Sequence, residues 1–484
     1  MGGEAELRVT FFPPLYLQRR IWVLDILRRE QVTEIVDIGC GEGQLLAVLC
    51  QPAPSLPPPG PGILAAHSGA SPTALEAGDF DLHPTRVTGL DISSHALASA
   101  IEDTSPAAAN TSYTRWESLQ VNIWHGGLEI FNPAFINAEC IVATEVVEHL
   151  PEEILADFAP MILGVYHPRL LLVTTPSYGF NARFSPPGLI NTATGFPDPT
   201  KRTDRVFRHH DHKFEWTIEE FQEWCEGTAQ EWGYDVDTTT IGRAQEKDEW
   251  GRDEELGGAS QVAIFKRLEG EAWATIREEK STSMKESPKS QKVHRLLETH
   301  HYDAHVRAGK RGSAEEIAKA VSDKFDEWEA AELRLEEIWF VEEIGAICGG
   351  WFEVLIEVIE GSPKFDLQRS KGQRRGDWPV LLVGGRPGKK KKTSEWAPEQ
   401  LPDDLFEEVL QSEGYRSDDD PGFDWGSGLY SSDSGVDLLW DISKDDNAWA
   451  KESAWTCDSS DDVVDWGAGR WCTLSAAWDF DSPE

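Results

Sequence analysis

The segment EVVEHL places two carboxylates and an imidazole close together, at Glu145, Glu148 and His149. If this segment is helical, side chains at i, i+3 and i+4 lie on one face. About sixty residues later, the segment FRHHDHKFEWT supplies further imidazoles, among them His212. Carboxylate oxygens favour Mg²⁺ or Mn²⁺, and the imidazoles make Ca²⁺ a poorer fit. The pattern predicts a site for a hard divalent cation, with a solvated helix face as the alternative.

A glycine-rich turn lies upstream, in TEIVDIGCGEGQLLAVL (33–49). The apolar run 35–38 is typical of a buried parallel strand. Gly39, Gly41 and Gly43 allow a sharp turn and the close approach of a ligand, and the apolar spacing that follows predicts a helix. The G-x-G-x-G spacing differs from the dinucleotide fingerprint and lacks the Lys-Ser/Thr of a phosphate loop.

Three more strand candidates follow this turn. The first, RVTGLDIS, carries Asp91 at its end, where a carboxylate can accept hydrogen bonds from both hydroxyls of a ribose. The second, VNIWHGG, brings Gly126 and Gly127 to the same rim, and the third, ECIVATE, runs directly into Glu145. Because open α/β sheets bind ligands at the carboxyl ends of their strands, cofactor and metal are expected to share one crevice.

The order strand, glycine turn, helix, strand, acid resembles that of S-adenosylmethionine-dependent methyltransferases. This resemblance implies an α/β, Rossmann-like fold with a mainly parallel sheet. Four motifs make the resemblance specific: EVVEHL, TTPSYGFN (174–181), FRHHDHKFEWTIEEFQEW and ASQVAIFKR. Together with the opening FFPPLYLQRRIWVLDILR, they resemble the Hua-enhancer family of small-RNA 3′-terminal 2′-O-methyltransferases over roughly residues 6–268.

The resemblance assigns roles by position. It implies that four residues are at once catalytic residues and metal ligands: Glu145, Glu148, His149 and His212. It implies that the cofactor contacts are Asp37, Gly39, Gly41, Asp91 and, more loosely, Gly127. The implied cofactors are S-adenosylmethionine and Mg²⁺ or Mn²⁺.

The implied reaction is metal-dependent transfer of a methyl group to the 2′-hydroxyl of the 3′-terminal nucleotide of a small RNA. A divalent ion bound to the terminal 2′- and 3′-oxygens would stabilise the alkoxide and orient it. His209 or His210 would assist proton removal, or would contact a phosphate or serve a structural role. Two alternative functions stay open: a catalytically silent protein that binds RNA ends, and a small-molecule O-methyltransferase. Intact glycines and ligand positions argue against the first, and the basic run 201–208 argues against the second.

The composition of the chain sets further limits. The 484 residues carry a formal net charge of −40, which argues against promiscuous binding of nucleic acids but not against a local basic site. The seven cysteines lack C-x-x-C spacing and fit free thiols in a reducing compartment. No apolar run approaches about eighteen residues, so we expect no membrane contact. A cytoplasmic location is expected, and the basic clusters RSKGQRR and RPGKKKK raise nuclear import as a second location, with a solvated linker as the alternative.

Four regions are expected along the chain. Residues 1–270 form the catalytic domain, with a Pro-, Gly- and Ala-rich disordered insertion at about 51–84. Residues 271–312 form a linker. Residues 313–384 form an accessory helical segment, in which 313–347 reads as a helix with Ser313 and Glu316 in capping-box spacing. Residues 385–484 contain a basic cluster and then a disordered acidic tail.

The acidic tail carries repeated tryptophans. Trp425 with Gly426 and Trp466 with Gly467 resemble the tryptophan–glycine hooks that bind Argonaute proteins. Isolated aromatic residues on a flexible chain suit repeated weak docking, although compositional bias explains them as well. The resemblance to the family begins within the first ten residues, with no double-stranded-RNA-binding module before it. We therefore expect a single-stranded small RNA as the substrate, presented by an Argonaute-class protein.

Overall fold

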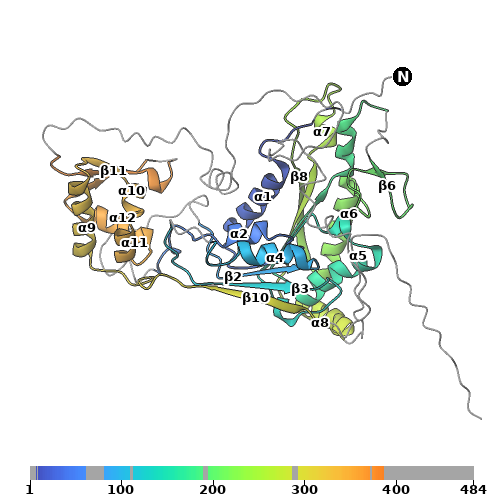
Figure 1. Cartoon of the computed structure of the whole chain (residues 1–484), viewed down its shortest axis with the longest axis horizontal. Helices are drawn as coiled ribbons and strands as arrows, with labels where there is room; N and C mark the ends of the chain where they lie inside the picture. Colours follow the sequence, from blue (N-terminus) through green and yellow to red (C-terminus); the bar gives the residue numbers. More distant parts are fainter. Residues whose placement is uncertain are drawn as a thin grey trace, which may run out of the picture.

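The computed structural model describes residues 7, 9–60, 81–108, 113–188, 195–285, 293–370 and 373–385 (Figure 1). The predicted acidic tail, its tryptophan–glycine pairs and the cluster RPGKKKK lie outside the described residues. Among the described helices, none is long and apolar enough to cross a membrane.

The centre of the molecule is an eight-stranded sheet in the order β10-β3-β2-β1-β4-β5-β9-β8. Its five central strands pair in parallel: β1 (Glu34–Ile38), β2 (Arg86–Asp91), β3 (Leu119–His125), β4 (Cys140–Thr144) and β5 (Leu170–Pro176). Three antiparallel strands extend its two sides: β8 (Tyr234–Ile241), β9 (Ser260–Arg267) and β10 (Arg295–Tyr302). The predicted α/β class with a mainly parallel sheet is confirmed, and each strand expected from the sequence forms.

Helices cover both faces of the sheet. Side chains alternate between the faces along each strand, and the central strands carry apolar residues on both faces. Ile141 and Ala143 of β4 pack into one apolar cluster, whereas Cys140 and Val142 pack into another. The first cluster is closed by α5 (Glu152–Ala159), the π-helical segment η4 (Pro160–Tyr166) and α6 (Ile218–Trp232). The second is closed by α1 (Leu15–Arg29), α2 (Gln44–Leu49) and α4 (Ser94–Asp103). Both faces of the central strands are therefore buried, as parallel strands require.

Several short elements connect these layers. They are η2 (Pro133–Phe135), η3 (Val147–His149), η5 (Tyr178–Phe184), β6 (Phe196–Pro197), β7 (Val206–Phe207) and α7 (Asp253–Leu256). Of these, η3 and η5 follow the carboxyl ends of β4 and β5, the edge where a ligand is expected.

The region predicted as a linker, 271–312, is structured in its described part. It contains α8 (Glu271–Lys285), which packs against η4, and β10, which joins the sheet beside β3. The sheet of the catalytic domain therefore extends past residue 270, and the boundary placed there is wrong. The sequence of β10, RLLETHHY, has no extended apolar run, and its burial is partial, as expected of a strand at the edge of a sheet.

The accessory region folds as a small α/β unit with its own apolar core. Its elements are α9 (Ala314–Glu327), β11 (Glu332–Arg334), α10 (Leu335–Trp339), α11 (Glu342–Ile347), α12 (Phe352–Gly361), β12 (Phe365–Leu367), the turn η6 (Arg375–Asp377) and β13 (Pro379–Leu382). The strands pair in the order β11-β13-β12. Within its described residues, the unit thus combines four helices with a small three-stranded antiparallel sheet.

The single helix predicted over 313–347 is wrong beyond its first half. The capping box of Ser313 and Glu316 forms, but α9 ends at Glu327 and Glu329 takes a left-handed conformation (φ +50°). Pairing of β11 with β13 then overrides helix propensity, because that pairing depends on residues far along the chain.

The start of the predicted insertion also differs from a disordered loop. Leu56 N donates to the Gly350 carbonyl at 2.7 Å, and Trp339 Nε1 donates to the Pro54 carbonyl at 2.8 Å. Residues 51–56 therefore help hold the accessory unit against the methyltransferase-like domain, and residues 61–80 lie outside the described part of the chain.

Candidate active site

The glycine turn after β1 needs glycine at each of its three positions. Gly39, Gly41 and Gly43 have φ of +71°, +53° and +85°, a region that other residues rarely adopt. A Cβ on Gly39 would lie 2.6 Å from a methyl carbon of Val146, which follows β4. The turn therefore packs directly against the start of the EVVEHL segment.

Two buried carboxylates lie beside this turn. Asp91 accepts hydrogen bonds from Gly41 N and Ser93 N, both at 2.8 Å, and so joins the end of β2 to the turn. Asp37 is fully enclosed, and burial, with the negative charge of Asp91 second, raises the pKa of Asp37 to about 8. Among the described residues, no group donates a hydrogen bond to Asp37 Oδ1. The structure thus brings together four of the five predicted cofactor residues.

A cavity runs from this turn towards the EVVEHL segment. Its lining includes Gly39, Asp91 and Gly126 at one end and His149 and Asp211 at the other. Gly127, the fifth predicted cofactor residue, is adjacent to this lining, and its carbonyl faces the imidazole of His294 at 2.9 Å. One cavity is therefore lined by residues from both predicted sites, by Gly39 and Asp91 of the cofactor set and by His149 of the metal set.

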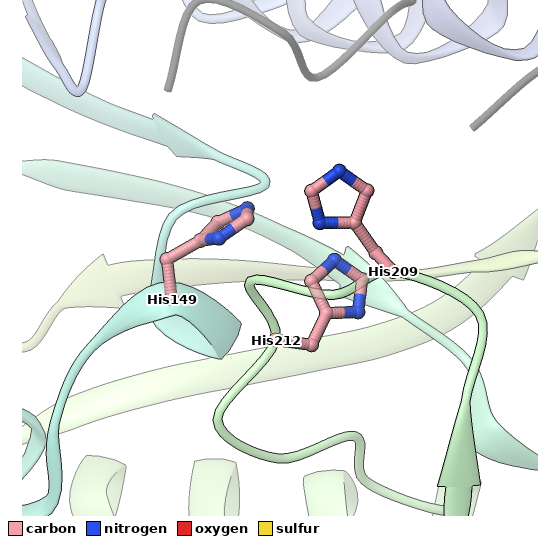
Figure 2. A group of neighbouring side chains, drawn as sticks. All are labelled: His149, His209 and His212. Carbon is pink, nitrogen blue, oxygen red and sulfur yellow. The ribbon is translucent and has the colours of Figure 1, made fainter. Parts of the chain in front are cut away.

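Two further imidazoles gather beside His149, which lines this cavity (Figure 2). His149 comes from η3, and His209 and His212 come from the loop after β7. All three are buried, and their candidate ligand atoms lie within 4.8 Å of one another. Among the described residues this is the one such group that could hold a metal ion, so the structure joins His149 to the predicted His212 and adds His209.

The two predicted glutamate ligands lie outside that group. Glu145 takes a left-handed conformation (φ +54°), and only 147–149 form a 3₁₀ turn, so the helix predicted to align the three side chains is wrong. Glu145 forms an ion pair with Arg19 at 2.8 Å and accepts from Thr174 Oγ1 at 2.7 Å. Glu148 is fully buried and accepts from Thr175 Oγ1 at 3.0 Å.

Hydrogen bonding assigns different tautomers to the two histidines of the loop. Glu215 faces His212 Nδ1 at 2.7 Å, and since a carboxylate only accepts, Nδ1 carries the hydrogen and Nε2 keeps a lone pair. His209 Nδ1 instead accepts from Asp211 N at 3.2 Å, so its Nε2 carries the hydrogen. Within the described chain neither buried Nε2 has a hydrogen-bond partner. His212 is thus suited to bind a cation, and His209 to donate to an oxygen.

His209 and His149 are held neutral. Burial, with His212 as the next cause, lowers the pKa of His209 to about 3 and that of His149 well below its ordinary value. A neutral imidazole can be a ligand or a donor, whereas a charged one would repel a cation.

The basic residues before the histidines are largely paired. Arg202 forms an ion pair with Glu152, and Arg205 with Glu220. Arg205 also lies over the Tyr178 ring, and Arg208 lies over the Phe184 ring with its guanidinium carbon 3.6 Å from the centroid. Carboxylates therefore balance the positive charges of Arg202 and Arg205, and the net positive charge around this segment is smaller than the sequence suggested.

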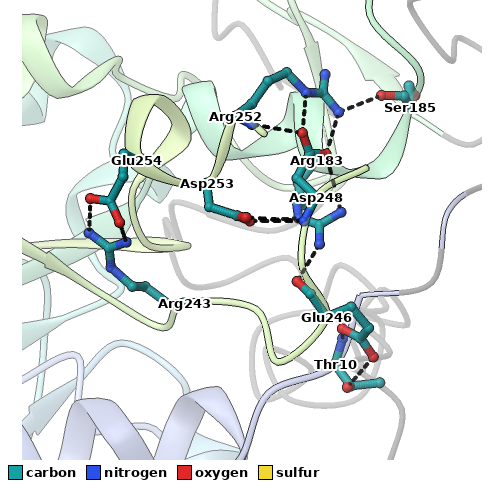
Figure 3. A network of polar contacts seen from close by, with 9 residues as sticks. All are labelled: Thr10, Arg183, Ser185, Arg243, Glu246, Asp248, Arg252, Asp253 and Glu254. Atoms are coloured by element: carbon teal, nitrogen blue, oxygen red, sulfur yellow. Dashed lines mark hydrogen bonds and ion pairs between the residues drawn. The ribbon is translucent and has the colours of Figure 1, made fainter. Parts of the chain in front are cut away.

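A buried polar network fixes the segment that leads to α1 (Figure 3). Arg183 of η5 forms an ion pair with Asp248 at 3.4 Å and donates to the Glu246 carbonyl. Glu246 accepts from Thr10 N at 2.9 Å, and Arg252 holds Asp248 at 2.8 Å. The network ties residues 244–253 to η5 and to the strand-like start of the chain, and so helps place Arg19 of α1 beside Glu145.

Sequence reasoning missed the supporting residues of the site. Arg19, Thr174, Thr175 and Glu215 all hold predicted site residues. A signal existed for three of them, because the threonines open TTPSYGFN and Glu215 lies three residues after His212. Nothing in the sequence linked Arg19 to Glu145, which lies 126 residues away along the chain.

Comparison with known proteins finds similarity to small RNA 2′-O-methyltransferases from several organisms. Over 272 residues (55% of this chain, 24% of the relative) it is 30% identical to a small RNA 2′-O-methyltransferase of Arabidopsis thaliana. Over 283 residues (58% of this chain, 61% of the relative) it is 25% identical to one of Gallus gallus. The chain thus spans less than two thirds of these relatives' length. No family model matches it.

Solved structures are similar at a lower level. A crystal structure of small RNA methyltransferase HEN1 is 24% identical, with a TM-score of 0.40, and the match covers 62% of this chain and 29% of that one.

Proposed function

We propose, on the premise that this chain belongs to the small RNA 2′-O-methyltransferase family, that it methylates the 3′-terminal 2′-hydroxyl of a small RNA with S-adenosylmethionine as donor. The observation that carries the proposal is one cavity whose lining joins the two groups of residues. It is lined by Gly39 and Asp91, where a nucleoside is held in such folds, and by His149 and Asp211. A methyl group presented from one end would therefore meet a substrate oxygen at the other.

The residues at the imidazole cluster fit a divalent cation. The observation that supports this fit is the buried Nε2 of His212, which keeps a lone pair and has no hydrogen-bond partner among the described residues. His212 and His149 would bind the cation. Glu148 and Glu145, which contact Thr175 and Arg19 in this structure, would have to turn towards the cluster to supply its carboxylates. Such a cation, Mg²⁺ or Mn²⁺, would supply stabilisation of negative charge on the 2′-oxygen and orientation of the terminal ribose.

The protein's own groups contribute positioning. Asp91 has its two oxygens fixed by Gly41 N and Ser93 N, so its carboxylate keeps one orientation at the end of β2, where such folds hold a ribose. His209 Nε2–H would donate to an oxygen of the terminal nucleotide. Because the sulfonium methyl carbon is already activated by its positive charge, alignment with the 2′-oxygen supplies most of what the transfer needs.

The test uses purified protein, labelled S-adenosylmethionine, Mn²⁺ or Mg²⁺, and three RNAs that end in ribose, 2′-deoxyribose or a 3′-phosphate. Transfer to the first RNA alone is expected, and chelation should abolish it. Equal transfer to the 3′-phosphate RNA would contradict recognition of the end. Binding of RNA ends without any transfer would instead favour a silent binding protein, and methylation of small hydroxylated molecules alone would favour a small-molecule enzyme.

We further propose that the substrate is single-stranded and is presented by an Argonaute-class carrier that binds residues 400–484. The support is the repetition of tryptophan along that acidic segment, since several weak docking events on one chain raise the effective concentration, to about the millimolar range for short flexible linkers. Truncation at residue 400 should leave activity on free RNA unchanged and lower it on carrier-bound RNA. Equal activity of both forms on carrier-bound RNA would remove this role from the tail.

A further inference from the structure

The strand β10 brings a buried histidine to the cofactor end of the sheet. β10 pairs antiparallel with β3, with Arg295 opposite His125, so the residue before β10 lies at the carboxyl end of β3. That residue is His294, and it is only 7% exposed. It lies beyond the segment that resembles the methyltransferase family, in the region expected to be a linker.

His294 supports the turn that follows β3. Its Nε2 lies 2.9 Å from the Gly127 carbonyl, and because a carbonyl only accepts, Nε2 is the donor. Its ring also occupies the space beside Gly126, where an added Cβ would lie 2.3 Å from His294 Cδ2. Phe135 packs against the other side of the ring, with centroids 5.7 Å apart. The imidazole therefore contacts two successive glycines and restricts their backbone conformation.

The supported turn is part of the cavity wall. Gly126 lines the cavity, and Gly126 N donates to the Asp91 carbonyl at 3.0 Å. On the neighbouring strand end, His125 binds the carbonyl of Ile92, another lining residue, at 2.9 Å. Two successive glycines have more backbone freedom than any other pair, so this wall keeps one shape only if other groups hold it.

We infer that His294 is a positioning residue for S-adenosylmethionine. Its imidazole holds the Gly126–Gly127 turn in the shape that the nucleoside end of the cofactor needs. The inference rests on the proposed function, because it assumes that this cavity binds that cofactor. It assigns part of the cofactor site to a strand outside the family-like segment.

The test measures S-adenosylmethionine binding by calorimetry with the full chain. His294→Phe keeps a flat ring and removes the donor, and His294→Gln keeps a donor. Loss of one hydrogen bond of about 0.5–1.5 kcal/mol predicts a dissociation constant roughly 2- to 12-fold higher for His294→Phe, with partial recovery in His294→Gln. The Michaelis constant for the cofactor should rise in parallel, while kcat at saturating cofactor and the Michaelis constant for RNA stay within about twofold.

The matched control is His300→Ala. His300 lies on β10 itself and, like His294, bonds a main-chain carbonyl, that of Ile101 at 3.0 Å, but neither His300 nor Ile101 lines the cavity. It should leave cofactor binding unchanged. Unchanged binding in His294→Phe, or an equal loss in His300→Ala, would overturn the inference. A wild-type chain that does not bind S-adenosylmethionine would contradict the proposed function itself.

Discussion

Glu215 determines which nitrogen of His212 can bind a cation. The carboxylate is buried and accepts two further hydrogen bonds besides that of His212, from Asn181 Nδ2 at 2.7 Å and from Arg208 N at 3.3 Å. The main-chain carbonyl of Glu215 accepts a third, from Arg205 at 2.9 Å. The carboxylate is therefore rigid, and a rigid acceptor holds the imidazole in one tautomer and one orientation. Residues of this kind tune the site without touching the substrate.

Replacement of Glu215 by Gln should weaken cation binding while the fold is kept. The neutral amide is nearly isosteric but enforces the tautomer less strongly, and loss of such a partner typically costs about 10–100-fold in metal affinity. The concentration of Mn²⁺ or Mg²⁺ for half-maximal methyl transfer should rise by about that factor, with calorimetric binding of S-adenosylmethionine unchanged. His210→Ala is the control, because His210 is about half exposed and outside the cluster. An unchanged cation requirement in Glu215→Gln would speak against His212 as a ligand.

The raised pKa of Asp37 predicts that the free energy of unfolding of the cofactor-free protein depends on pH. This pKa is about 8 when folded, against an ordinary value of 3.8, so between these pH values the folded chain holds one more proton than the unfolded chain. Stability should therefore fall as pH rises through this window, by at most about 1.4 kcal/mol per pH unit from this group. Urea unfolding of Asp37→Asn and wild type at pH 6 and pH 8 checks this. The variant should gain relative stability at pH 8, and parallel pH profiles would contradict the raised pKa.

At the scale of elements, strands and turns were predictable and the element that carries the site was not. The apolar runs at β1 and β4 and the left-handed glycines have local signals. The EVVEHL segment also matched a local pattern, but pairing of β4 with β5 keeps the chain extended to Thr144, and Glu145 N then donates to the Thr174 carbonyl at 3.0 Å. Two β-branched valines and Pro151 further disfavour a regular helix there. The third imidazole, at His209, joined the site only through loop geometry that spacing does not encode.

Glycines in different elements should respond oppositely to replacement by alanine. Gly227 lies exposed within α6, has no neighbour within 4 Å of an added Cβ, and is helical. Gly227→Ala should therefore raise the free energy of unfolding by about 0.5–1 kcal/mol. Gly39→Ala should instead destabilise the turn and abolish cofactor binding, since its φ is +71° and Val146 blocks the Cβ. Thermal melts and calorimetry measure both, and a destabilised Gly227→Ala would show that α6 tolerates no side chain there.

For the molecule as a whole, the accessory unit docks at the edge opposite the cavity. β3 starts at Leu119 and β10 ends opposite it at Tyr302, on the amino edge of the sheet. There Trp116 is buried, packs 6.4 Å from the Trp339 ring, and fits against Gly350, where a Cβ would lie 2.6 Å from the indole. The accessory unit and the cavity therefore lie at opposite edges of the sheet.

Trp116→Ala should loosen the accessory unit without affecting the cavity. Removal of a large buried aromatic side chain typically costs about 3–5 kcal/mol. Limited proteolysis between the sheet and α9 should become faster and the thermal midpoint should fall. The dissociation constant for S-adenosylmethionine should stay within about twofold of wild type. Weaker cofactor binding with an unchanged rate of proteolysis would contradict the role of Trp116 in holding the accessory unit.

The strand β10 runs from His294 at the cofactor edge to the accessory unit at the other edge (Figure 1). Eight residues at about 3.3 Å each make it a stiff spacer of roughly 26 Å. The accessory unit is therefore held at a fixed distance from the cavity, at the opposite edge of the same sheet.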